Sequence, residues 1–257
     1  MARNTTVFPF SYGLFWFKEA LRVFSLAPLS YLGVVLFYLL TSGLLSSIPL
    51  LGQVIASAWM PFGTLLIAMA TRNVLEHQPI SYDPLFSTLK KPGLRTRLLN
   101  MGLVYALALQ LVAAVFFTMA SDTVASWADV ESLSEAEIPW GALIVTVLLY
   151  LPCVLLSLFS PILAADAGLP VAKSFFFSIS ACLLQWRASL MAGLLYLGSS
   201  FVLGTLLVLG FRLLGIFNYV IWVAPFYIAF MTAFGFAFIW PMYRDLFGEK
   251  GLLDEQE

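Results

Sequence analysis

Six apolar stretches, each long enough to cross a lipid bilayer, divide this 257-residue chain. A helix needs roughly 20 apolar residues to span the hydrocarbon core, and every stretch meets that length. Hydrophobic residues make up 61% of the chain and charged residues 11%, whereas a soluble domain carries about 25% charged residues. We therefore predict an all-α, polytopic membrane protein with a single integral membrane domain over residues 1–257. The predicted spans cover about 28–50, 51–71, 98–120, 139–165, 188–211 and 216–241.

Positive charge predicts the orientation of these spans. In this arrangement of spans, twelve of the thirteen Lys and Arg residues fall on one side of the membrane, and Arg212 alone falls on the other. The 121–138 loop, on the same side as Arg212, contains five acidic residues and no basic one. Basic residues accumulate in the cytoplasmic loops of membrane proteins. We therefore predict a multi-pass membrane protein with both termini in the cytoplasm.

The chain repeats one plan three times, as a cytoplasmic amphipathic helix followed by a hairpin of two spans. The first of these helices is predicted over 13–26 and the third over 170–186, and a shorter second one begins at Asp83-Pro84. The third carries a thin polar stripe of Ser174, Ser178 and Gln185. Helices of this kind lie in the membrane interface with their apolar side toward the acyl chains. Packing as lids under the bundle is the alternative, and the two arrangements are compatible.

The second helix of every hairpin contains proline. These prolines are Pro61, Pro152, Pro161 and Pro225. Proline removes a backbone donor and kinks a helix. Together with Gln110, the strongest polar candidate within a span, the prolines mark a candidate hinge or mid-membrane cavity. The simpler interpretation is that bent helices pack around one another and that Gln110 forms an interhelical hydrogen bond.

We predict no catalytic, cofactor-binding or metal-binding residues in this chain. Ionisable residues avoid the centres of the spans, and Asp166 and Arg212 lie near span ends. His77 is the single histidine, without Cys or carboxylate partners at the spacing of a metal site. Cys153 and Cys182 fall in different topological places, and we expect both to be inert packing residues, with palmitoylation or redox sensing as the alternative at Cys182. The sequence also lacks a phosphate-binding glycine loop and a basic–aromatic surface suited to nucleic acid.

A basic cluster precedes the third span. It consists of Lys90, Lys91, Arg95 and Arg97. Its simplest role is to set the topology of the neighbouring helices. Clusters of this kind beside a membrane helix also bind anionic lipid headgroups, which makes these four residues candidate headgroup contacts.

Four short motifs, in order along most of the chain, carry a resemblance to known proteins. They are Ile48-Pro49-Leu50-Leu51-Gly52, Asp83-Pro84-Leu85-Phe86, Ser178–Leu183 followed by Trp186, and Tyr243-Arg244-Asp245-Leu246-Phe247. With the hairpin plan, they resemble an uncharacterised proteobacterial family of six-helix integral inner-membrane proteins with BPSS-type locus names. That family has no assigned activity, so the resemblance implies no catalytic residue. The plan is also similar to membrane domains attached to some glycerophosphodiester phosphodiesterases, which implies a lipid setting by analogy.

These observations favour a non-enzymatic inner-membrane protein that organises lipid or a partner complex. The partners expected are membrane lipids and other membrane proteins, with no nucleic acid. The alternative function is a transporter or exporter of a small neutral or lipid-like solute. Because no buried carboxylate lies within a span, such a transporter would work without proton or sodium coupling. A membrane-embedded enzyme is a third hypothesis, and it lacks every usual catalytic set.

Overall fold

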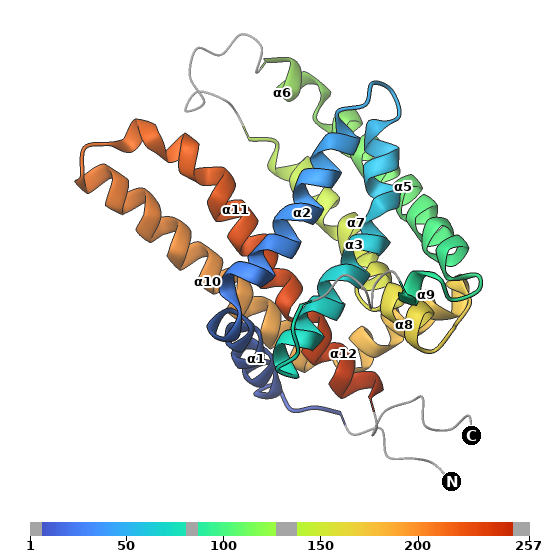
Figure 1. Ribbon diagram of the computed structural model, residues 1–257. Helices are drawn as coiled ribbons and strands as arrows, with labels where there is room; N and C mark the ends of the chain where they lie inside the picture. The colour runs from blue at the N-terminus through green and yellow to red at the C-terminus, as the bar shows by residue number, and fades with distance from the viewer. Residues whose placement is uncertain (1–6, 81–86, 127–137, 249–257) are drawn as a thin grey trace.

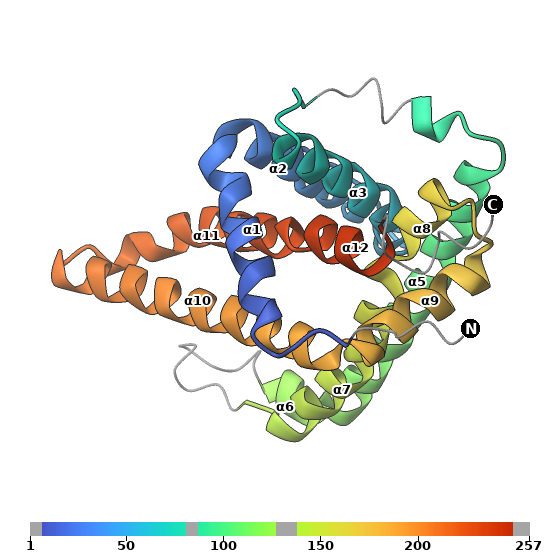
Figure 2. The same ribbon diagram turned by 90° about the horizontal axis from the view of Figure 1, so that it is seen from below.

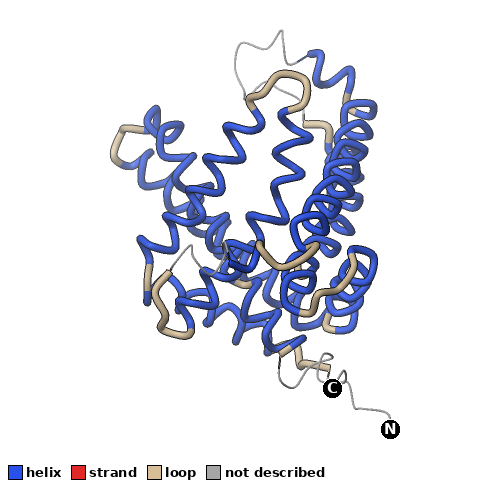
Figure 3. The backbone as a smooth tube through the Cα atoms, turned by 45° about the vertical axis from the view of Figure 1, so that its right-hand side comes forward, coloured by secondary structure: helices blue, strands red, loops and turns tan. Residues whose placement is uncertain are grey.

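The computed structural model describes residues 7–80, 87–126 and 138–248, and every regular element within these ranges is helical (Figure 3). Six helical segments are long and apolar enough to cross a membrane, which confirms the predicted all-α, six-span class. The elements are α1 (Tyr12–Leu26), α2 (Pro28–Ser46), α3 (Gly52–Leu75), α5 (Leu94–Met119), α6 (Ser121–Ser126), α7 (Trp140–Ser157), α8 (Ser160–Asp166), α9 (Val171–Leu184), α10 (Trp186–Leu213), the 3-10 helix η2 (Phe217–Tyr219), α11 (Val220–Ala237) and α12 (Ile239–Phe247). The start of the predicted second amphipathic helix, Asp83-Pro84, lies outside the described residues.

The predicted spans and the observed helices differ mainly at their ends. α10 extends the predicted 188–211 span in both directions. The fourth span is divided into α7 and α8, and the sixth into α11 and α12. The helix α12 ends at Phe247, beyond the predicted end at residue 241. It stays in the bundle because its side chains pack against other elements.

Proline and glycine explain two of the helix ends. Pro28 is the first residue of α2, and Ala27 before it leaves the helical conformation with a φ of −148°, as a following proline favours. α10 ends in a Schellman motif with Gly215 at φ +69°. The Gly215 N–H donates to the Arg212 carbonyl over 3.1 Å, and the Ile216 N–H donates to the Phe211 carbonyl over 3.0 Å.

Small residues allow two close helix crossings. Gly102 of α5 meets the backbone of α3 at Ala58, where a Cβ on the glycine would clash. Gly13 of α1 meets α10, and a Cβ there would lie 2.5 Å from the Ala188 carbonyl oxygen. Figure 2 shows α1 running across α10 and α11, so this helix ties the last two long helices to the N-terminal part of the chain.

The bundle is packed at one end and open at the other. Buried side chains come from Tyr31–Tyr38 of α2, Thr64–Val74 of α3 and Met231–Ala237 of α11, together with α1, α8 and α12. We call this end the packed half. At the other end, the open half, Leu44 of α2 and Phe201 of α10 are 71% and 76% exposed. Figure 1 shows α10 and α11 diverging from α2 toward this end.

The two ends of the bundle hold different elements. α1, α8, α9 and α12 gather at the packed half, whereas α6, the α2–α3 turn and the α10–α11 turn lie at the open half (Figure 1). The first and last described helices therefore share an end, as the predicted six-span topology requires. The distribution of positive charge predicts that this end faces the cytoplasm.

Candidate functional site

The basic cluster lies beside the C-terminus of α8, and two of its members are hydrogen-bonded there. Lys91 Nζ donates to the Ala165 carbonyl over 2.8 Å, and Arg97 Nη1 donates to the Ala164 carbonyl over 3.4 Å. The last carbonyls of a helix have no partner within the helix, and cations near them are stabilised by the helix dipole. These two side chains therefore fix α8 to the start of α5.

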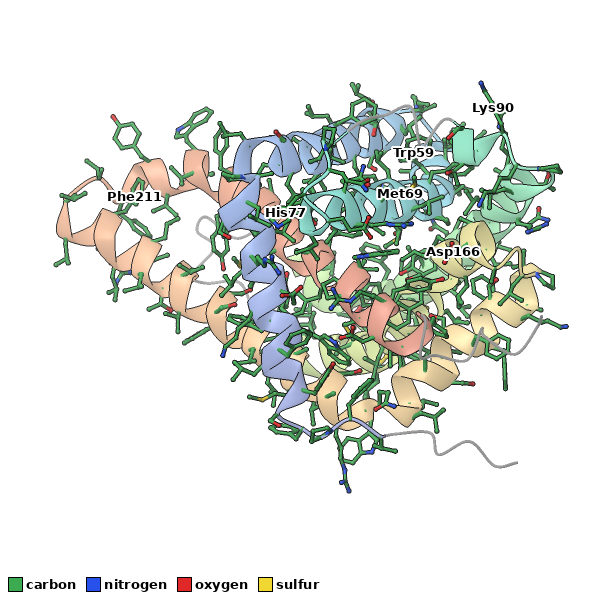
Figure 4. All side chains as sticks on the ribbon, turned by 60° about the horizontal axis from the view of Figure 1, so that its bottom comes forward. Trp59, Met69, His77, Lys90, Asp166 and Phe211 are labelled. Carbon is green, nitrogen blue, oxygen red and sulfur yellow. The ribbon has the colours of Figure 1, made fainter. Side chains whose placement is uncertain are left out.

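The other two members of the cluster are turned toward the surface. Arg95 is exposed, and its Nε donates to the Leu89 carbonyl over 3.0 Å. Lys90 is exposed and points away from the bundle (Figure 4). Lys91 is exposed as well, so three of the four basic residues of the cluster lie at the surface.

The five hinge or cavity candidates do not converge on one place. Pro61 of α3 and Pro161 of α8 are buried in the packed half. Pro152, Pro225 and Gln110 are exposed on the surfaces of α7, α11 and α5. The structure therefore does not place Gln110 between Pro61 and the other prolines.

Pro161 marks a break between α7 and α8 that is bridged by a serine from α9. Ser178 Oγ donates to the Leu155 carbonyl over 2.6 Å and accepts from the Phe159 N–H over 3.2 Å. The hydroxyl thus lies between the Phe159 N–H and the Leu155 carbonyl, which would otherwise form one i→i−4 hydrogen bond of a continuous helix. A side chain inserted into this pattern is a recognised cause of a sharp kink. Ser157 adds a hydrogen bond to the Tyr105 hydroxyl at 3.3 Å, which links the break to α5.

The polar stripe of α9 faces the protein, and two of its apolar residues face outward. Ser174 and Ser178 are buried, whereas Phe176 and Leu183 are 66% and 59% exposed. Gln185, just after α9, is also buried, and its Oε1 accepts from the Phe8 N–H over 2.8 Å. In water, outward phenylalanine and leucine would be unfavourable, but they suit a helix at the boundary between headgroups and acyl chains.

A polar contact network joins α1 to α12 at the packed half. Trp16 Nε1 donates to Asp245 Oδ2 over 2.9 Å, and Arg244 Nε donates to Asp245 Oδ1 over 3.0 Å. Arg244 also lies 3.7 Å from Glu19. Burial and the neighbouring Asp245 carboxylate raise the pKa of Tyr12 above its ordinary value, which keeps this phenol neutral. The network holds the two terminal helices together and leaves Asp245 already paired.

Asp166 and His77 have structural partners as well. The Tyr243 hydroxyl donates to Asp166 Oδ2 over 3.0 Å. His77 has φ +57° after the end of α3, and its N–H donates to the Val74 carbonyl over 3.1 Å. His77 thus occupies the position that glycine usually takes in a Schellman motif. Across the described ranges, no three His, Cys, Asp or Glu side chains gather as metal ligands would.

Two grooves open on the membrane-facing surface of the open half. One, of about 540 Å³, lies between α2, α3 and α5. Its lining residues include Phe37, Leu44, Trp59, Phe62 and Leu99. The other, of about 460 Å³, lies between α10 and α11. Both are open, shallow grooves lined mainly by apolar side chains.

Comparison with known proteins agrees with this architecture. The chain is similar to a protein described as a probable inner membrane protein of Burkholderia thailandensis, with 25% identity over 254 residues. The aligned region covers 92% of this chain and 91% of the relative. This chain has six helical segments that are long and apolar enough to cross a membrane. No family model and no solved structure matches it.

Sequence reasoning missed the role of three residues at these contacts. Ser178 was identified only as part of a stripe, and Trp16 and Tyr243 were not identified as hydrogen-bond donors. The sequence did mark two of them, because Ser178 and Tyr243 both lie in the motifs that carry the family resemblance. Their partners, Leu155, Phe159 and Asp166, are distant in sequence, so the pairing required the fold.

Proposed function

We propose that this protein is a non-catalytic inner-membrane protein that binds phospholipids and orders them around its bundle. The observation that carries the proposal is the one-sided packing, with a buried core in the packed half and exposed apolar helices in the open half. Phe201 of α10 and Phe226 of α11, for example, are 76% and 72% exposed. Acyl chains are the natural neighbours of such surfaces, and diverging helices leave space for lipids between them.

Surface chemistry at the packed half supports the same proposal. α9 directs Phe176 and Leu183 away from the protein, as a helix in the membrane interface would. Lys90 and Arg95 lie exposed at the same end of the bundle, and cations in this position attract anionic headgroups. The carboxylates that a catalytic site could use, Asp166 and Asp245, are occupied by Tyr243 and by Trp16 with Arg244.

The proposal is tested by lipid retention. The variant Lys90→Gln/Arg95→Gln should bind phosphatidylglycerol roughly 30-fold more weakly, because each basic residue near an anionic surface contributes about 1 kcal/mol. Native mass spectrometry of the delipidated protein, titrated with phosphatidylglycerol, measures the change. The charge-matched control, Lys18→Gln/Lys173→Gln, removes one charge each from α1 and α9, outside the cluster, and should weaken binding less than the variant does. Equal binding by the variant, the control and wild type would contradict the proposal.

Transport of a neutral or lipid-like solute is the second candidate, and the groove between α2, α3 and α5 favours it. The indole Nε1 of Trp59, a residue that lines this groove, is buried without a hydrogen-bond partner, and a turn of the side chain would let it donate to an ester carbonyl. A fluorescent lipid in proteoliposomes would report passage between leaflets. For a transporter, Leu99→Trp should slow passage by filling the groove, whereas Leu107→Trp, on an exposed face of α5, should not. No passage above protein-free liposomes would exclude this function.

A further inference from the structure

The groove between α10 and α11 has the shape of a site for one acyl chain. Its lining includes Ser200, Gly204, Thr205, Arg212 and Tyr227. From Ser200 to Arg212 the helix rises by about 18 Å, at 1.5 Å per residue. That length slightly exceeds half of the roughly 30 Å hydrocarbon core, which is the depth of one leaflet.

The floor of this groove is built by a tyrosine and a glycine. The Tyr227 hydroxyl donates to the Ser200 carbonyl over 2.6 Å, and both residues line the groove. Gly204 leaves space beside the phenol, because a Cβ at this position would lie 3.1 Å from the Tyr227 hydroxyl. The small-residue pair Ser200 and Gly204 therefore serves the α10–α11 contact and the groove.

A single cation stands at the mouth of the groove. The Arg212 guanidinium lies over the Phe217 ring, 5.2 Å from its centroid, and this stacking holds it at the end of α10. Within the described part of the chain, no carboxylate lies within ion-pair distance of Arg212. Guanidinium groups bind phosphate through two parallel hydrogen bonds.

The position of Arg212 separates it from the basic cluster. α10 is about 42 Å long, and Arg212 lies at the end remote from the packed half. Figure 4 shows its neighbour Phe211 at the far tip of the α10–α11 pair, well away from Lys90. A phosphate at Arg212 therefore belongs to the leaflet opposite to the one that meets Lys90 and Arg95.

We propose that this groove binds one anionic phospholipid of that leaflet, with its phosphate on Arg212 and one acyl chain lying between α10 and α11. The proposal rests on the proposed lipid-binding function and adds a defined site to it. The charge at the mouth and the apolar, leaflet-deep groove together match a phospholipid better than a soluble anion, which would leave the groove unfilled.

Native mass spectrometry with phosphatidylglycerol provides the test. Arg212→Gln should lose one retained lipid, with binding to that site at least fivefold weaker, and Gly204→Leu should lose the same lipid by filling the groove. The matched control is Gly193→Leu, on the same helix with open space around it, which should retain the full number. The Arg212→Gln change leaves the α10–α11 packing intact, so it reports on binding even where Gly204→Leu folds poorly.

The outcomes separate this site from the proposed function. If Arg212→Gln and Gly204→Leu retain as many lipids as wild type while Lys90→Gln/Arg95→Gln loses them, the groove site is wrong and lipid binding at the cluster stands. If wild type retains no phosphatidylglycerol, both proposals fail. Conversion of a wild-type dimer to a monomer by Gly204→Leu would identify a second copy as the occupant and overturn the lipid site. If glycerol phosphate competes for this site as strongly as phosphatidylglycerol does, the proposal that an acyl chain lies in the groove is wrong.

Discussion

Cys182 lies on α9 with 5% of its surface exposed, and burial raises the pKa of its thiol to about 12. Only the thiolate reacts with alkylating agents, and at pH 8 such a thiol is ionised in about one molecule in ten thousand. We predict that iodoacetamide modifies Cys182 at least 100-fold more slowly in the folded protein than in SDS. Because the pKa is raised, the rate should keep rising with pH well beyond pH 9. Intact-mass spectrometry in a Cys153→Ala background follows the reaction.

The Cys182 experiment has a clear contrary outcome. A rate that levels off near pH 9 in mild detergent would show an ordinary, accessible thiol. Palmitoylation or redox sensing at Cys182 would then return as a real alternative to inert packing. The single-cysteine background is needed because Cys153 is also buried and unpaired.

His77 gives a second prediction at the scale of one residue. Its φ of +57° is left-handed, a conformation that costs an L-residue about 1–2 kcal/mol and costs glycine almost nothing. Glycine also loses more entropy on folding, so His77→Gly should stabilise the protein by about 0.5–1 kcal/mol. Thermal unfolding in detergent measures this. His77→Val, which is branched at Cβ, should destabilise it, and a loss of stability in His77→Gly would point to a role for the imidazole.

At the scale of elements, the break between α7 and α8 depends on one hydroxyl from α9. Ser178→Ala would leave the Leu155 carbonyl and the Phe159 N–H without their shared partner. An unsatisfied buried polar group costs about 1–3 kcal/mol, so we expect a loss of about 2 kcal/mol in unfolding free energy. Urea or thermal unfolding in detergent would detect it. Ser180→Ala, two positions along the same helix, should change stability by less than about 0.5 kcal/mol.

The same break shows what the sequence could and could not predict about elements. Pro161 correctly indicated that the fourth span is not one straight helix, because proline removes a backbone donor. Ser178 was visible as part of a polar stripe, but a stripe alone does not say which carbonyl it meets. The sequence did not predict α12, because Tyr243, Arg244 and Asp245 are polar enough to indicate a solvent-exposed C-terminal segment. Their contacts with Asp166, Glu19 and Trp16 are long-range, and no local pattern encodes them.

At the scale of the whole molecule, the six spans were predictable and the one-sided core was not. Span prediction needs only apolar length, which every stretch supplies. In a membrane, however, a leucine that faces lipid and a leucine that faces the core look the same in sequence. Ile67 is fully buried and Leu197 is 63% exposed, although both lie in long apolar helices. The open half, the grooves and the exposed position of Gln110 therefore emerged only from the fold.

Orientation is the whole-molecule prediction on which the two lipid sites depend. The twelve-to-one distribution of Lys and Arg predicts that the packed half is cytoplasmic. Ala125 and Gln78 are both exposed and lie toward opposite ends of the bundle. In a Cys153→Ala/Cys182→Ala background, an impermeant maleimide added to intact cells should label Ala125→Cys and leave Gln78→Cys unlabelled until the membrane is opened. Labelling of Gln78→Cys alone would show the opposite orientation. Arg212 would then lie at the cytoplasmic leaflet, and Lys90 and Arg95 would lie at the outer one.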